Sequence, residues 1–166
     1  MKKILGILAA VLLIGIATGG ELSWMDLSTT EERHGHDEGF VLHVELYDTD
    51  EKRMISDGDL RLIYYPMLVG HGTWRYEEDV LKNETIQVTK SMFKNGVLKL
   101  PQINYNDLRD LFINRTYEVD EIGVKNVPVH PRGVEIGARF TTPSGTSRYS
   151  SVEQWLPDSY HLSPFD

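Results

Sequence analysis

The chain has 166 residues, contains no cysteine and carries a formal net charge of -8 at pH 7 with its histidines neutral. This acidity repels nucleic-acid phosphates and anionic lipid headgroups, so no nucleic acid and no anionic membrane surface is expected as a partner of the folded part. Without disulfides, that part must depend on apolar burial or on metal or partner contacts, and residues 21–166 suffice for one domain.

Residues 1–20 have the composition of an export signal. Two lysines precede an unbroken apolar run over residues 4–17, and small residues follow at 18–20. A helix from residue 4 to residue 20 is only about 25 Å long, short of the roughly 30 Å core of a bilayer, which favours a cleavable signal peptide. An uncleaved membrane anchor is the alternative, because helix tilt, a thin bilayer and an interfacial Trp24 can accommodate a short span. Both readings predict an extracytoplasmic protein, secreted or held at the membrane by this N-terminal segment.

Residues 21–38 are polar and charged. Ser28-Thr29-Thr30-Glu31-Glu32 is followed by Arg33-His34-Gly35-His36-Asp37-Glu38, and no apolar repeat accompanies them. Such a composition predicts a polar spacer that carries the folded domain away from the membrane or the signal cleavage point.

From residue 39 onward, apolar side chains recur at every second position, which is typical of strands with one buried face. The clearest alternation covers residues 40–47, and a second covers residues 60–65, where Pro66 should end the strand or leave it at a sheet edge. Further strands are expected at residues 73–76, 85–89, 97–100, 115–119, 134–140 and 146–152. Many short strands separated by turn residues predict an all-β fold, an antiparallel β-sandwich over residues 39–154.

Helical signals are short. Residues 106–112 can form two turns, with Asn106 as the N-cap and Leu108, Leu111 and Phe112 on one side. Residues 91–96 can form a single turn between strands. Neither segment is long enough to set the architecture.

The strand pattern resembles that of immunoglobulin-like or fibronectin-type surface modules. The resemblance rests on Val41-Leu42-His43-Val44-Glu45-Leu46-Tyr47-Asp48, on the turn Asp57-Gly58 and on Asp59-Leu60-Arg61-Leu62-Ile63-Tyr64-Tyr65. The strand at 134–140 with its Pro143-Ser144-Gly145 turn is similar to the final hairpin of such modules. The chain departs from true immunoglobulin domains in lacking the cysteine pair, so Trp74 is only a stand-in for their core tryptophan. The resemblance implies adhesion, scaffolding or ligand display.

Histidines and carboxylates gather at two places that offer metal ligands. Zinc or copper ligands are available in the spacer and on nearby segments: His34, His36, Asp37, His43 and His71. Calcium ligands crowd two turns: Asp48, Asp50, Glu51, Asp57 and Asp59. A spacer loses conformational entropy on binding, the turns lack the fixed spacing of a calcium loop, and Asp and Gly form turns without metal. We therefore predict no metal site and no cofactor.

The sequence carries no catalytic signature. It lacks a Gly-x-Ser-x-Gly elbow, a His-Glu-x-x-His motif and a glycine-rich phosphate loop between a strand and a helix. We therefore do not expect this protein to be an enzyme. One unusual stretch, Gly70-His71-Gly72-Thr73-Trp74-Arg75-Tyr76, is a possible binding loop for a sugar or peptide through His71, Trp74 and Tyr76. Glycines beside an aromatic strand also form plain hairpins.

Two Asn-x-Thr sequons are present, Asn83-Glu84-Thr85 and Asn114-Arg115-Thr116. An exported chain meets glycosylation machinery where its host has it, and the motif selects surface positions. We therefore expect Asn83 and Asn114 to be glycosylation candidates that lie exposed at turns or strand edges.

Residues 155–166 form an aromatic tail broken by two prolines, which suits an extended strip. The tail either covers an open face of its own domain or inserts into a neighbouring subunit. The expected function is that of an exported or cell-surface-anchored β-sandwich with a non-catalytic binding, adhesion or scaffolding role toward an unknown protein or glycan. A subunit of a surface filament or envelope layer is the alternative with the same fold. A metal-dependent or glycan-processing enzyme would need a pocket where acids and histidines converge.

Overall fold

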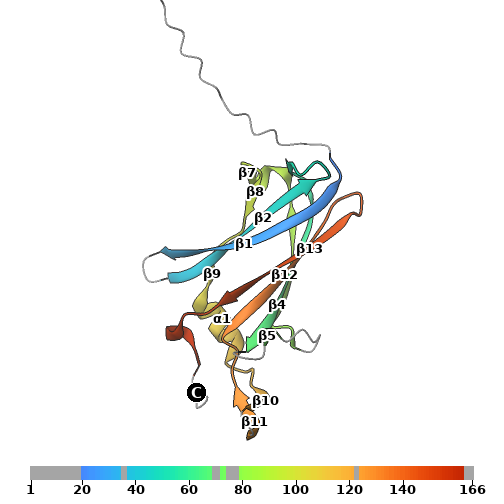
Figure 1. Ribbon diagram of the computed structural model, residues 1–166. Coiled ribbons are helices and arrows are strands. Elements are labelled where there is room, and N and C mark those ends of the chain that lie inside the picture. Colours follow the sequence, from blue (N-terminus) through green and yellow to red (C-terminus); the bar gives the residue numbers. More distant parts are fainter. Residues whose placement is uncertain (1–19, 35–36, 69–71, 74–78, 122–123, 163–166) are drawn as a thin grey trace, which may run out of the picture.

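The computed structural model describes residues 20–34, 37–68, 72–73, 79–121 and 124–162 (Figure 1). Apart from Gly20, the expected leader lies outside these residues. The described part consists mainly of antiparallel strands, with one α-helix, which confirms the all-β expectation.

The first sheet is built around a long central strand, β2. Strand β2 pairs with β1 on one side and with β8 on the other, β7 continues the sheet beyond β8, and β3 and β9 also pair with β2. The bounds are β1 Leu22–His34, β2 Asp37–Asp48, β3 Arg53–Met54, β7 Phe93–Lys94, β8 Val97–Lys99 and β9 Ile103–Asn104.

The second sheet has the order β13-β12-β4-β5, and β6 also pairs with β4. Its strands are β4 Gly58–Leu68, β5 Gly72–Thr73, β6 Lys82–Val88, β12 Gly133–Thr141 and β13 Ser147–Trp155. The remaining elements are a separate hairpin, a helix and two short 3₁₀ turns: β10 Tyr117–Glu121, β11 Val124–Val129, α1 Tyr105–Phe112, η2 Lys90–Met92 and η3 Asp158–Tyr160. Helix α1, η3 and the β10–β11 hairpin gather at the end of the molecule away from the start of β1 (Figure 1).

One hydrophobic cluster draws side chains from both larger sheets. On β2 the alternation expected from the sequence holds, since the even-numbered apolar residues are buried and the odd-numbered positions 43, 45 and 47 are only half-buried. The second sheet contributes alternate residues of β4 and β12 to the same cluster. The central members are Phe40, Leu42, Val44, Leu46, Leu60, Leu62, Tyr64, Val134, Ile136, Ala138 and Phe140. Burial of this shared apolar surface is the main force holding the sheets together.

The segment expected as a polar spacer is mostly strand β1. Its residues pair with β2 from Leu22 opposite Asp48 to His34 opposite Asp37. Leu22, Met25 and Leu27 are buried, but an irregularity in the pairing between Leu22 and Trp24 breaks their two-residue period. The interrupted period and the many Ser, Thr and Glu residues explain why the sequence pattern suggested a spacer.

Strand β4 continues through Pro66, contrary to the expectation that this proline ends the strand or lies at a sheet edge. The carbonyl of Tyr64 accepts from Leu81 N at 2.9 Å, toward β6, while the carbonyl of Met67 accepts from Arg132 N at 3.0 Å, toward β12. Because successive residues alternate in direction, the nitrogen of Pro66 faces the same side as the Tyr64 carbonyl, but it lies just outside the β6 ladder, whose first residue, Lys82, pairs with Tyr64. No N–H is needed at that place, so the proline is tolerated inside the sheet.

The other short elements shift slightly from their expected bounds. Helix α1 begins one residue before the expected Asn106 cap, and Asn104 occupies its N-cap position without a side-chain hydrogen bond. Burial of Tyr105 in the core favours the earlier start. The turn expected at 91–96 is the 3₁₀ turn η2 followed by β7.

Candidate functional site

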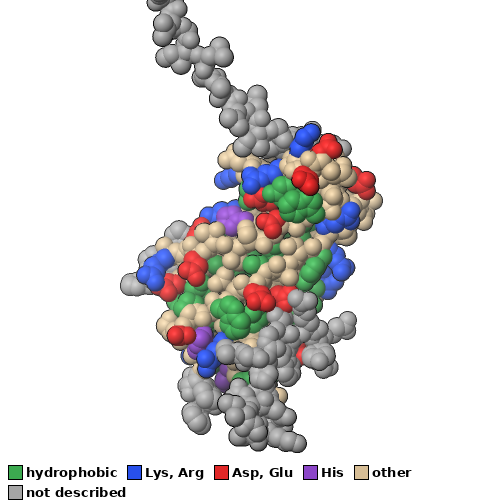
Figure 2. Space-filling view, in the orientation of Figure 1, with side chains coloured by type: hydrophobic (Ala, Val, Ile, Leu, Met, Phe, Trp, Pro, Cys, Tyr) green, Lys and Arg blue, Asp and Glu red, His purple; other side chains and the backbone are tan. Residues whose placement is uncertain are grey.

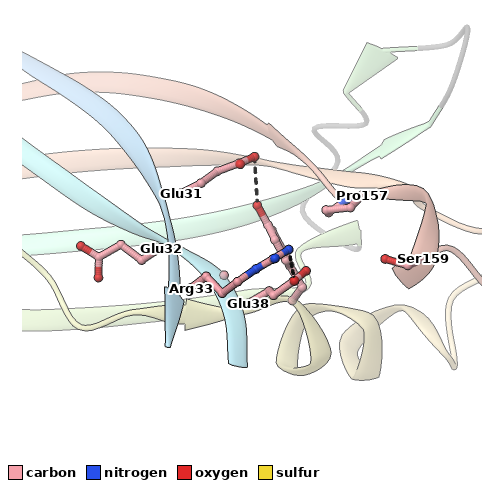
Figure 3. Close-up of a pocket in the computed structure, with 8 residues that line it drawn as sticks. Glu31, Glu32, Arg33, Glu38, Pro157 and Ser159 are labelled. Atoms are coloured by element: carbon pink, nitrogen blue, oxygen red, sulfur yellow. Dashed lines mark hydrogen bonds and ion pairs between the residues drawn. The ribbon is translucent and has the colours of Figure 1, made fainter. Parts of the chain in front are cut away.

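A groove of about 460 Å³ lies where the β1–β2 hairpin projects past the second sheet, beside α1 and η3 (Figure 3). Its lining comes from four elements and the segment before η3: Glu31, Glu32, Arg33, Glu38, Gly39, Tyr105, Pro157 and Ser159. Ligand sites typically measure about 300–1,000 Å³, so the groove is large enough for a side chain or a short peptide segment.

The groove forms because the inner face of β1 changes character along its length. Met25 and Leu27 are buried against the core, whereas Glu31, on the same face, is exposed. Glu31 and Glu32 lie on opposite sides of the β1 ribbon, as strand alternation requires (Figure 3). Glu32 turns to the outer face, where Lys99 Nζ lies 2.6 Å from its Oε1. The carboxylates available to the groove are therefore those of Glu31 and Glu38.

Hydrogen bonds tie these carboxylates to two tyrosines. Tyr105 Oη donates to Glu31 Oε1 at 3.4 Å, and Tyr160 Oη donates to Glu38 Oε2 at 3.4 Å. Arg33 forms an ion pair with Glu38 (Figure 3). The hydroxyl and guanidinium donors hold the carboxylates in place and leave acceptor lone pairs on Glu31 facing solvent.

Tyr105 links the groove to the core. Its side chain is 2% exposed, its ring centroid lies 6.0 Å from that of Phe40 and 5.3 Å from that of Tyr160, and Gln154 Nε2 donates to its hydroxyl at 3.4 Å. Burial, followed by the negative charge of Glu31, raises the pKa of Tyr105 to about 12. The hydroxyl is therefore neutral at physiological pH and serves as a donor.

The described lining of the groove offers hydrogen-bond donors from Tyr105 and Arg33 and acceptors from Glu31 and Glu38. Within the described ranges, no group of three or more His, Cys, Asp or Glu side chains is placed to hold a metal ion. The geometry suits reversible recognition of a charged or hydrogen-bonding partner.

Only Gly72–Thr73 of the expected binding loop is described, as β5, and His71, Trp74 and Tyr76 lie outside the described residues. The same holds for His36 and for the side chains of His34 and Asp37. His43 is described, and it lies on the outer face of β2, in register with Ser28 on β1 and Lys99 on β8.

The acidic turns use their carboxylates to fix the backbone. Asp48 Oδ1 accepts from the N–H groups of Asp50 and Lys52 at 2.9 and 3.0 Å. In the second turn, Asp57 Oδ1 accepts from Lys90 N at 2.7 Å, which connects the turn to η2. These contacts give Asp48 and Asp57 a turn-forming role.

Both sequon asparagines are exposed, in different settings. Asn83 is on β6, where its Oδ1 accepts from Arg61 Nε at 3.1 Å. Asn114 lies in the turn that follows α1.

The part of the tail that the structure describes packs on its own domain. Leu156 and Leu162 belong to the core cluster, and Leu156 N donates to the carbonyl of Arg132 at 2.9 Å. Pro157 and Ser159 form one wall of the groove. Residues 155–162 thus cover the end of the domain instead of extending from it.

A second surface feature lies on the outer face of the first sheet. Trp24 and Tyr47 are stacked across β1 and β2 with ring centroids 3.8 Å apart. Tyr47 Oη donates to Glu45 Oε2 at 2.5 Å, which raises the pKa of Tyr47, and Arg53 pairs with the same carboxylate oxygen at 2.7 Å. The ring stacking, the hydrogen bond and the ion pair connect these four side chains, as expected of a cross-strand cluster that stabilises the sheet.

Charged side chains of both signs are spread over the face seen in Figure 2, with hydrophobic side chains in small separate patches. The helix in the described part is too short to cross a membrane. Comparisons with protein-family models, with curated proteins and with solved structures gave no match to this chain.

Sequence reasoning missed Glu31, Glu38 and Tyr105 as site residues. The only available signal was the change on the inner face of β1 from apolar residues to Glu31, and it became visible only once that segment was seen to be a strand.

Proposed function

We propose that this chain is an exported or surface-anchored domain, an immunoglobulin-like two-layer β-sandwich, that acts by non-catalytic binding. Its ligand is a basic segment of a partner protein, received in the groove between the β1–β2 hairpin, α1 and η3. Export is supported by the two lysines and the apolar run in residues 1–20. The sandwich arrangement is supported by the single hydrophobic cluster that the two larger sheets share.

The observation that carries the proposal is the groove itself. It combines ligand-sized volume with walls from segments distant in sequence, and its carboxylates are held by Tyr105, Tyr160 and Arg33. A site whose charged groups are already positioned loses little entropy when a ligand binds.

The chemistry of the lining favours a cationic protein segment over a sugar. The ring of Tyr105 is buried against Phe40 and Tyr160, so it offers no open face for stacking on a sugar. The acceptor oxygens of Glu31 complement lysine or arginine side chains, and the net charge of -8 attracts such a partner over longer range.

The test uses the full chain and a fluorescent decapeptide of alternating lysine and glycine as the probe, with fluorescence anisotropy at low salt as the readout. Glu31→Gln should weaken binding about fivefold, because one lost charge contact at a surface is worth about 1 kcal/mol. The weakening should shrink as salt is added, since exposed charges are screened.

Asp26→Asn is the matched control, because Asp26 is an exposed carboxylate on the same strand but on its outer face. It should leave peptide binding unchanged. Equal loss in both variants, or no binding by the unaltered protein, would contradict the groove proposal. If a neutral oligosaccharide bound instead, and Glu31→Gln weakened that binding, the groove would be assigned to glycans.

A further inference from the structure

The two sequons stand in different structural settings, and only one of them leaves its asparagine free to react. We propose that Asn114 is an N-glycosylation site of the folded protein and that Asn83 is protected by the sheet. Modification in the cell rests on the proposed export, because the chain must meet the transferase. The difference in accessibility between the two asparagines can be tested separately on the purified protein.

Asn83 is held by both its backbone and its side chain. It lies within β6, whose residues pair with β4 from Val88 opposite Gly58 to Lys82 opposite Tyr64. Its side-chain oxygen accepts a hydrogen bond from Arg61 Nε, and Thr85, the third residue of the sequon, lies opposite Arg61 in the ladder. An enzyme that must surround the three residues would have to peel β6 from the sheet.

Asn114 has neither restraint. It is exposed in the turn between α1 and β10, and its side chain has no hydrogen-bond partner in the part of the chain that the structure describes. Its neighbours are held instead: Ile113 N donates to the Arg109 carbonyl at 3.2 Å, Arg115 N donates to the Phe112 carbonyl at 2.9 Å, and the Arg115 carbonyl lies 2.9 Å from His130 Nδ1. None of these contacts involves the side-chain amide of Asn114, which is the group that reacts. Thr116 is also exposed. A bulky glycan at this place would extend into solvent.

The co-reactant is a glycan linked to a polyprenyl diphosphate. The side-chain amide nitrogen of Asn114 forms a bond to the anomeric carbon of the glycan, and the bond from that carbon to the diphosphate oxygen breaks. Polyprenyl diphosphate leaves with the bonding electron pair, and the amide proton passes to a base of the transferase. The Thr116 hydroxyl completes the acceptor motif.

The test incubates the purified, folded full chain with an oligosaccharyltransferase and the polyprenyl diphosphate-linked glycan, and follows each site by peptide mass spectrometry. Asn114 should be modified at least about tenfold faster than Asn83. Short synthetic peptides carrying the two sequons give the intrinsic rates, by which the rates in the folded chain are divided. Thr116→Val should abolish modification at Asn114, whereas Thr116→Ser should retain it, and both exposed changes should leave the melting temperature unaltered.

Equal normalised rates at the two sites, or a folded chain that stays unmodified at Asn114 while its peptide reacts, would overturn the inference. A second arm maps glycopeptides of the protein recovered from its own cells. Unmodified Asn114 in protein found outside the cytoplasm would count against the inference. Full-length protein in the cytosol would count against the proposed export, and the difference between the two asparagines would then be tested by the experiment with the purified protein.

Discussion

Tyr105 is the residue at which the groove and the core meet. Its ring packs between Phe40 and Tyr160, while its hydroxyl reaches Glu31 on the groove wall. A phenolate at this position would be both desolvated and next to a carboxylate, which is why its pKa rises to about 12.

Because of this shift, the free energy of unfolding of the domain should fall at alkaline pH. An unfolded tyrosine loses its proton near pH 10, whereas folded Tyr105 keeps it to about pH 12. The contribution to the free energy of unfolding is therefore complete below pH 10 and is lost as the pH rises from 10 to 12. Urea unfolding should show that Tyr105→Phe reduces the loss of stability over this range by about 2 kcal/mol.

Tyr149→Phe is the control for the pH experiment, because Tyr149 is half exposed on the outer face of the second sheet. It should follow the unaltered protein at every pH. Parallel stability curves for Tyr105→Phe and the unaltered protein would show that this hydroxyl does not contribute to the loss of stability at alkaline pH.

At the scale of the elements, the short strand β9 depends on a glycine in β2. Gly39 pairs with Asn104, and a Cβ at residue 39 would overlap the backbone carbonyl of Ile103. Because the two backbones approach closely, β9 lies beside β2 and leads directly into α1. The first residue of α1, Tyr105, therefore lies at the groove. A side chain at position 39 would push these elements apart.

Gly39→Ala should therefore destabilise the domain by about 2 kcal/mol or more, because backbone atoms must move to admit the methyl group. Gly137→Ala on β12 is the matched comparison. Its Cβ would meet the Tyr149 hydroxyl at 2.6 Å, but that ring end can swing toward solvent, so the cost should be much smaller. Chemical denaturation of both variants measures the difference, and equal losses would contradict this account of the β2–β9 contact.

Strands with uninterrupted alternation could be predicted from the sequence, and β2, β4 and β12 contain the segments expected for them. Strand β1 could not, because its irregular pairing at Leu22 and Trp24 shifts the apolar period and its exposed residues resemble a linker. The extension of β4 past Pro66 could not be predicted either, since it depends on where β6 begins to pair with β4, at Lys82 opposite Tyr64. These errors arise from partners distant in the chain, which local patterns do not encode.

At the scale of the whole molecule, the first and last described strands meet. Strands β1 and β13 pack against each other, and Arg148 Nε donates to the Ser23 carbonyl at 2.5 Å, next to the irregular pairing in β1. The chain after β13 then turns back, and Leu156 and Leu162 enter the core. The end of the described chain thus completes the domain that β1 begins.

Leu156→Ala should consequently lower the free energy of unfolding by about 2–4 kcal/mol, as for other buried leucines. Trp155→Ala removes a larger side chain but one that is 43% exposed, so its cost should be smaller. Thermal unfolding at several protein concentrations measures both. A melting temperature that rises with concentration would indicate that the tail packs on a second copy instead, as in the filament alternative.

The groove could not be predicted because no single stretch of sequence contains it. Glu31 and Glu38 fall in a segment that resembles a spacer, Tyr105 precedes the expected helix, and Ser159 belongs to the tail. The pattern did indicate that Leu108, Leu111 and Phe112 share one side of α1, and in the structure Leu108 and Phe112 are buried while Leu111 is partly buried against the core. These residues pack the helix against the core, and the position of the helix brings the Tyr105 hydroxyl within hydrogen-bonding distance of Glu31.

The direction of β1 determines how the groove would be displayed. The strand starts next to the N-terminal segment and ends at the groove, and its 13 residues span about 40 Å at roughly 3.3 Å per residue. If residues 1–20 tether the chain, β1 acts as a rigid stalk that holds the recognition surface clear of the lipid headgroups. A partner could then dock from the surroundings without first penetrating the crowded layer at the membrane.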